Sequence, residues 1–155
     1  MIKYKKHIAL IFQYQKLHNV SKIYSDGKID TLLCKKCSNR RSERKEIITE
    51  IVETEIKYGR DLRIIVEEFY RPMLIAGLLT SELLATIFLN VDELIQVNNK
   101  FAEMLKEAVD SAVEQGCDDL TTVSIGEIFL ESIGMLRAFE SYCTRQVRLN
   151  GTIYY

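Results

Sequence analysis

The chain has 155 residues, of which 47% are apolar, with one proline and seven glycines. This length suits one domain with a buried core, and the composition excludes a disordered tail, a collagen-like chain and a repeat array. The net charge of −1 conceals two opposite segments: residues 1–45 carry 12 basic and 3 acidic residues, whereas residues 46–155 carry 9 basic and 19 acidic residues. Composition therefore predicts one helical domain behind a basic N-terminal segment.

Residues 1–43 form this basic leader, which we predict to be a loop or disordered. Within it, residues 3–18 have a weak apolar side and predict a short basic helix. The longest apolar run, Ile8–Phe12, is too short for a membrane span or a secretory signal, which indicates a cytoplasmic protein. No acidic residue precedes Asp26, so a mitochondrial presequence remains an alternative, although the leader lacks arginine up to that residue.

Cys34 and Cys37 form a single CxxC pair. A structural zinc site needs four ligands, usually two such pairs or one pair with two histidines three to five residues apart. His7 and His18 are separated by ten residues, so they do not match this spacing. We therefore interpret Cys34 and Cys37 as loop thiols in a reducing compartment, in preference to a zinc site. We therefore predict no metal and no cofactor.

The first long helix is predicted over residues 44–70, with Ser42 as a possible N-cap. Pro72 disfavours helical geometry at the residue before it, so the helix is expected to end by that point. Glu50 and Glu55 are expected to flank its apolar face on opposite borders. The apolar side chains recur every three, four or seven residues and share one helical face: Ile47, Ile51, Tyr58, Leu62, Ile65 and Phe69.

Three more helices are predicted downstream, because the apolar periods there are helical and none alternates with period two. A short helix begins with Ser81 as its cap, and a long helix to residue 114 starts at Asn90 or Asp92. A turn follows, and the last helix covers residues 124–146. Residues 147–155 are expected to be a frayed tail.

These elements predict the all-α class: an elongated helical bundle over residues 44–146, between an irregular N-terminal leader and a C-terminal tail. Large apolar side chains from all four helices are expected to build its core. They are Ile51, Leu62, Ile65, Phe88, Leu94, Phe101, Ile128, Phe129 and Phe139.

Several motifs within residues 44–146 resemble the conserved regions of Dbl-homology domains, the guanine-nucleotide exchange modules of Rho-family GTPases. The first region is similar at Arg44, Ile47-Ile48, Glu50-Ile51-Val52, Thr54-Glu55, Tyr58 and Asp61-Leu62. The later segments are similar at Phe88–Leu94, Ser124–Leu130 and Phe139–Cys143. The motifs occur in the family's order and at its spacing.

The resemblance implies an exchange factor that binds the switch regions of a Rho-family GTPase without covalent chemistry, so it is not an enzyme in the covalent sense. It implies that Glu50 contacts the first switch loop, with Thr54 and Glu55 as weaker GTPase-binding candidates. The family's late helix, with its Gln-Arg pair, and the pleckstrin-homology domain have no counterpart in this sequence. The resemblance therefore covers the N-terminal two-thirds of such a domain, and the alternative is a non-catalytic interaction module, inactive or competing.

Two other classes are disfavoured by the sequence. It contains no glycine-rich phosphate loop, no HExxH and no nucleophile elbow, and both histidines precede the organised domain. The basic leader forms no recognised nucleic-acid-binding motif. We therefore predict no nucleic-acid partner, no membrane span and no metal.

Overall fold

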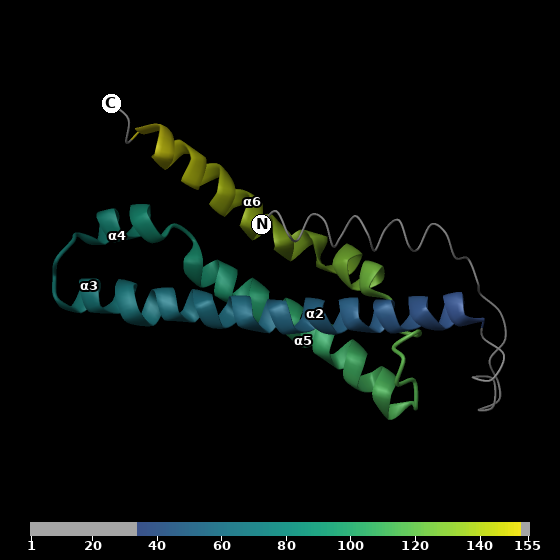
Figure 1. Cartoon of the computed structure of the whole chain (residues 1–155). Coiled ribbons are helices and arrows are strands. Elements are labelled where there is room, and N and C mark those ends of the chain that lie inside the picture. The colour runs from purple at the N-terminus through teal and green to yellow at the C-terminus, as the bar shows by residue number, and fades with distance from the viewer. Residues whose placement is uncertain (1–33, 153–155) are drawn as a thin grey trace.

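The computed structural model describes residues 34–152 of the chain. No strand occurs in this part of the chain, and the predicted all-α class is confirmed (Figure 1). The helix predicted over residues 3–18 lies outside the described residues. The elements are α2 (Lys35–Ile65), a π-helical turn η2 (Val66–Tyr70), α3 (Arg71–Ile75), α4 (Ser81–Phe88), α5 (Val91–Glu114) and α6 (Ile125–Thr152).

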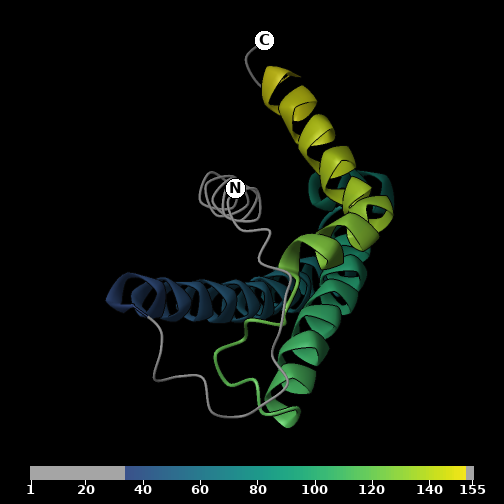
Figure 2. The ribbon, with the colours of Figure 1, turned by 90° about the vertical axis from the view of Figure 1, so that its right-hand side faces the viewer.

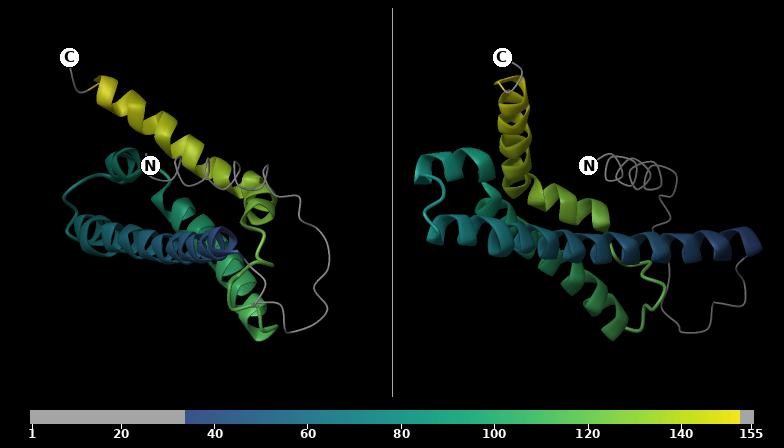
Figure 3. Two further views of the ribbon diagram at one scale, coloured as in Figure 1. Left: turned by 45° about the vertical axis from the view of Figure 1, so that its right-hand side comes forward. Right: turned by 60° about the vertical axis from the view of Figure 1, so that its left-hand side comes forward.

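Helix α5 is the centre of the bundle, because it packs against both α2 and α6. Figure 2 shows α5 crossing beside α2, and α6 continuing away from their junction toward the C-terminus. Figure 3 shows that η2 and α3 prolong α2 as one rod, and that α6 bends along its length. The result is an elongated bundle built on three long helices and one short one, as predicted.

Two apolar clusters fill the space between the helices. The larger one is buried where the N-terminal half of α2 meets the C-terminal half of α5 and the start of α6: Ile48, Ile51, Phe101, Leu105, Ala112, Leu120, Val123, Ile125 and Ile128. The smaller one lies toward the other end: Leu62, Val66, Val91, Leu94 and Ala138. Residue numbers rise along α2 as they fall along α5, so the two helices pack antiparallel.

Helix α2 begins at Lys35, with Cys34 as its N-cap, so the prediction of a loop or disordered leader up to residue 43 is wrong for residues 35–43. Lysine, arginine and glutamate are good helix formers, and they dominate this stretch. The frayed tail was also wrongly predicted, because α6 continues through Thr152. Both segments extend a helix that forms in the neighbouring residues, and extending a helix costs less free energy than starting one. A sequence rich in charged and short polar residues can therefore be helical there.

Pro72 does not end the first helix as predicted, because the backbone passes it within a continuous helical rod. The turn before it is widened: the N–H of Arg71 donates to the carbonyl of Val66, five residues back. Proline in a regular α-helix loses a hydrogen bond and clashes with the carbonyl four residues earlier. The π-turn relieves this conflict by locally opening the helix.

The boundaries of α4 and α5 agree closely with prediction. The cap of α4 is Thr80 and not Ser81: the Thr80 hydroxyl accepts a hydrogen bond from the N–H of Leu83 at 3.3 Å. Asn90 is the N-cap of α5, so the helix starts at one of the two predicted positions. Capping oxygens satisfy N–H groups that have no partner inside the helix.

Burial of the predicted core differs among its members. Ile51, Leu62, Leu94, Phe101 and Ile128 are buried. The three phenylalanines Phe88, Phe129 and Phe139 are only half-buried. Ile65 was wrongly predicted, because its side chain is 39% exposed. The buried face of α2 is therefore rotated relative to the predicted stripe.

Phe101 is the largest side chain that is almost fully buried, at 2% exposure, and its ring meets that of Phe129 edge-to-face with centroids 4.9 Å apart. We expect Phe101→Ala to lower the free energy of unfolding by about 3–5 kcal/mol, because it leaves a cavity in the larger cluster. Phe129→Ala should cost less, since that ring is half-buried. Urea unfolding monitored by circular dichroism measures both, with Leu130→Ala, an exposed neighbour, as the control. A Phe101→Ala loss no larger than the control would contradict this packing.

Candidate functional site

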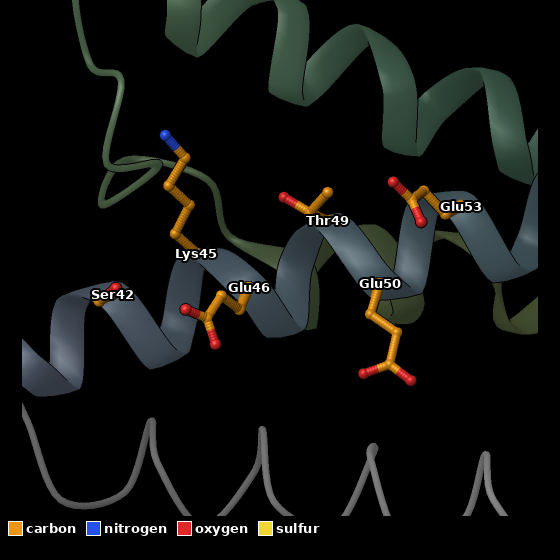
Figure 4. A pocket seen from close by; sticks show the side chains of 6 residues that line it. All are labelled: Ser42, Lys45, Glu46, Thr49, Glu50 and Glu53. Atoms are coloured by element: carbon orange, nitrogen blue, oxygen red, sulfur yellow. The ribbon is translucent and has the colours of Figure 1, made fainter.

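The candidate surface is the outer face of the N-terminal half of α2, around Glu50 (Figure 4). Glu50 is exposed, and Figure 4 shows its carboxylate pointing away from the helix on the side opposite to Thr49 and Glu53. The six side chains that line this depression all come from α2: Ser42, Lys45, Glu46, Thr49, Glu50 and Glu53. A surface supplied by one helix suits contact with another macromolecule better than enclosure of a small molecule.

Thr54 lies one turn after Glu50 and is half-buried. Its hydroxyl donates to the backbone carbonyl of Glu50 at 2.7 Å and to that of Ile51 at 3.0 Å. This local bond to a preceding carbonyl is the structural role that such a threonine often has within a helix. The Thr54 hydroxyl is therefore directed at the backbone that carries Glu50.

Glu55 does not lie on the solvent border of the apolar face, as predicted, but at its centre, where it is 4% exposed. The amide nitrogen of Asn98, on α5, donates to a carboxylate oxygen of Glu55 at 2.5 Å and to its backbone carbonyl at 3.1 Å. Asn98 itself is 1% exposed. A buried carboxylate requires hydrogen-bond donors to offset its lost hydration, and Asn98 supplies one.

Gly59 lies one turn beyond Glu55 on the same buried face. A Cβ atom added at Gly59 would overlap the side-chain oxygen of Asn98, so only glycine leaves room for this amide. Glu55, Gly59 and Asn98 together make a polar layer between the two apolar clusters. A polar group at one position of a helix interface can fix the register of the two helices.

Tyr58 borders this layer on the side of the smaller cluster, and its ring lies 6.0 Å from that of Phe139. Burial raises the pKa of Tyr58 to about 12, and the nearby negative charge of Glu55 adds to the shift. Both causes disfavour the tyrosinate. The phenol is therefore neutral over the whole physiological range.

Two arginines of α2 hold the loop between α5 and α6. Arg44 donates to the backbone carbonyls of Leu120 and Val123, the second at 2.5 Å. Arg41 pairs with Asp119 at 3.2 Å. Leu120 is buried with a φ of 56°, a conformation that costs energy in a residue other than glycine and persists where its surroundings enforce it.

The pKa of Asp119 is lowered although partial burial alone would raise it. Hydrogen bonds from Thr121 and Cys117, together with the charge of Arg41, outweigh that burial. These contacts were not predicted from the sequence. Arg44 was noted only as the first residue of a motif, and nothing in the local pattern indicates which carbonyls its guanidinium reaches.

No cluster of three or more histidine, cysteine or acidic side chains suited to a metal ion occurs within residues 34–152. Among the helices of that part of the chain, none combines the length and hydrophobicity needed to cross a bilayer. Glu50 is the site candidate that faces solvent, while Thr54 is half-buried and Glu55 is buried. The fold and this charged helix face define a helical module whose candidate site is an open surface.

The chain belongs to the RhoGEF domain family, whose model matches residues 47–154. This confirms the resemblance to Dbl-homology domains, and the match continues beyond the predicted limit at residue 146.

The similar proteins are much longer than this chain. Myosin-M heavy chain from Dictyostelium discoideum is 32% identical over 103 residues, which cover 66% of this chain and 6% of that protein. Human intersectin-1 is 31% identical over 109 residues, 70% of this chain and 6% of that protein. Rho guanine nucleotide exchange factor 3 from Gallus gallus is 27% identical over 127 residues, 82% of this chain and 23% of that protein. No solved structure gives a significant match.

The polar layer generates a stability prediction. Asn98→Ala should lower the free energy of unfolding by about 1.5–3 kcal/mol, because it leaves the buried Glu55 carboxylate without this donor. The same substitution in a Glu55→Gln background should cost less free energy, because no buried charge then loses a hydrogen-bond donor. Chemical unfolding of the four proteins of this cycle measures the coupling.

Asn99→Ala is the matched control, because Asn99 is an exposed neighbour that bonds Arg63 at 3.0 Å. It should change stability by no more than about 0.5 kcal/mol. Additive effects of Asn98→Ala and Glu55→Gln would show that the two side chains do not stabilise one another.

Proposed function

We propose that this domain is a guanine-nucleotide exchange factor for a Rho-family small GTPase, acting in the cytoplasm through the face of α2 that carries Glu50. Membership of the RhoGEF domain family supports this proposal most directly. The exposure of Glu50 on a rigid helix supports the choice of surface.

The proposed mechanism involves no covalent step. A GTPase holds its nucleotide through Mg²⁺ and switch loops that surround the phosphates. A partner that binds best to the conformation in which these loops have released Mg²⁺ and nucleotide shifts the population toward that conformation. The difference in affinity between the open and the closed switch states sets the size of this shift.

Glu50 would make the contact with the first switch loop. Its carboxylate accepts hydrogen bonds and competes for cationic or N–H groups that otherwise stabilise the closed loop. Helix α2 gives this carboxylate a fixed origin, because its opposite face is held against α5 by both apolar clusters. A contact presented from a rigid element loses less conformational entropy on binding than one from a loop.

Thr54 and Glu55 would contribute to the same surface less directly. The Thr54 hydroxyl bonds the carbonyl of Glu50, and Glu55 bonds Asn98 across the helix interface. We propose that both residues orient the part of α2 from which Glu50 projects. Substituting either should therefore weaken exchange less selectively than substituting Glu50.

The test measures release of a fluorescent guanine nucleotide from a panel of Rho-family GTPases in the presence of the full chain. On a GTPase that the chain activates, Glu50→Ala should reduce the stimulated rate by about tenfold or more, which corresponds to about 1.4 kcal/mol of lost stabilisation of the open state. Helix content should stay the same, because alanine favours helix and Glu50 is exposed.

Glu103→Ala is the control, an exposed acidic residue on α5 that lies outside the proposed surface. Equal stimulated rates for Glu50→Ala and the unaltered chain would refute the role of Glu50. Binding to a GTPase without faster release would support the alternative, a non-catalytic interaction module that competes for the same partner. A chain that neither binds nor activates any member of the panel would refute both functions.

A further inference from the structure

Cys34 and Cys37 lie together at the start of α2, and the proposed exchange function does not use them. Cys34 is the N-cap and Cys37 is the third residue of the helix. Both thiols are free and exposed. Side chains three residues apart in the first turn project from the same side of a helix, so the two sulfur atoms face a common region of solvent.

The surroundings of the pair are cationic. Lys35, Lys36 and Arg40 lie within the same two turns, and the first turn contains no acidic residue. The N–H groups at the start of a helix have no partners within the helix and favour negative charge nearby.

The two thiols differ in acidity. The pKa of Cys34 is lowered, chiefly by the N–H group and the thiol of Cys37, with a smaller effect from Lys36. The pKa of Cys37 is raised, chiefly by the Cys34 thiol. The thiolate is the nucleophile in cysteine chemistry. Cys34 is therefore placed to attack, and Cys37 to follow.

We propose that Cys34 and Cys37 form a reversible dithiol–disulfide site that reacts with low-molecular-weight disulfides of the glutathione type. The Cys34 thiolate attacks one sulfur of the small disulfide, forming a mixed disulfide and expelling one small thiolate. Cys37 then loses its proton to solvent and attacks the Cys34 sulfur, which expels the second small thiolate. The protein loses two hydrogen atoms and the small disulfide gains them as two thiols, so atoms and electrons balance.

A structural zinc ion is a poorer occupant of this pair. Such a site needs four protein ligands, and no third histidine, cysteine or acidic side chain joins the pair within residues 34–152. Cys117 and Cys143 are elsewhere in the bundle and only partly exposed. They provide internal references for reactivity in the same molecule.

The experiment titrates the reduced full chain with mixtures of oxidised and reduced glutathione, followed by intact-mass measurement and peptide mapping after alkylation. The expected product is a chain lighter by two hydrogens, with the bond between Cys34 and Cys37. Cys37→Ser should stop at a glutathione adduct on Cys34, because the resolving thiol is gone. Alkylation at neutral pH should be several-fold faster at Cys34 than at Cys143.

Cys143→Ser is the matched control and should still form the disulfide. Circular dichroism of each variant verifies that the helices persist, as expected for conservative substitutions at exposed or partly exposed thiols. The proposal fails if oxidation leaves Cys34 and Cys37 unbridged, if the bond joins other cysteines, or if Cys37→Ser accumulates no adduct on Cys34. None of these readouts depends on nucleotide exchange, so this proposal and the proposed function stand or fall separately.

Discussion

The hydrogen bond from Asn98 to the buried carboxylate of Glu55 is the contact on which the arrangement of α2 and α5 depends. It lies between two apolar clusters. Apolar contacts alone would let α2 and α5 slide past one another, since dispersion and burial have little directional preference. A buried charge is different, because it tolerates only the register in which its donor is present. Gly59 completes this constraint by leaving space for the amide of Asn98.

This constraint also determines where the candidate surface faces. Glu50 and Glu55 are five residues apart, which is roughly 140° around an α-helix. Turning Glu55 into the interface therefore turns Glu50 outward, and Figure 4 shows its carboxylate pointing away from the helix. Two acidic residues of one motif thus have opposite environments. The inner one orders the helix pair, and the outer one is exposed on the candidate surface.

Much of this fold follows from the sequence, because the helical periods of Ile51, Leu62, Leu94 and Phe101 are set by local geometry. The orientation of α2 could not be predicted in the same way. A stripe drawn through apolar residues excludes glutamate and glycine, and these two residue types occupy the centre of the buried face. Both residues face Asn98, which lies on α5 and is distant in sequence. The residue pattern within α2 therefore does not reveal this contact. The contacts of Arg44 with loop carbonyls are non-local for the same reason.

The π-turn at Val66–Tyr70 has a consequence for the far end of the rod. An extra residue in one turn changes the angular phase of everything beyond it, by about 100° relative to an uninterrupted α-helix. The side chains of α3 therefore do not continue the core face of α2 at the ordinary period of 3.6 residues per turn. One widened turn thus sets the direction in which the side chains of α3 face, because it rotates every residue beyond it about the helix axis by the same angle.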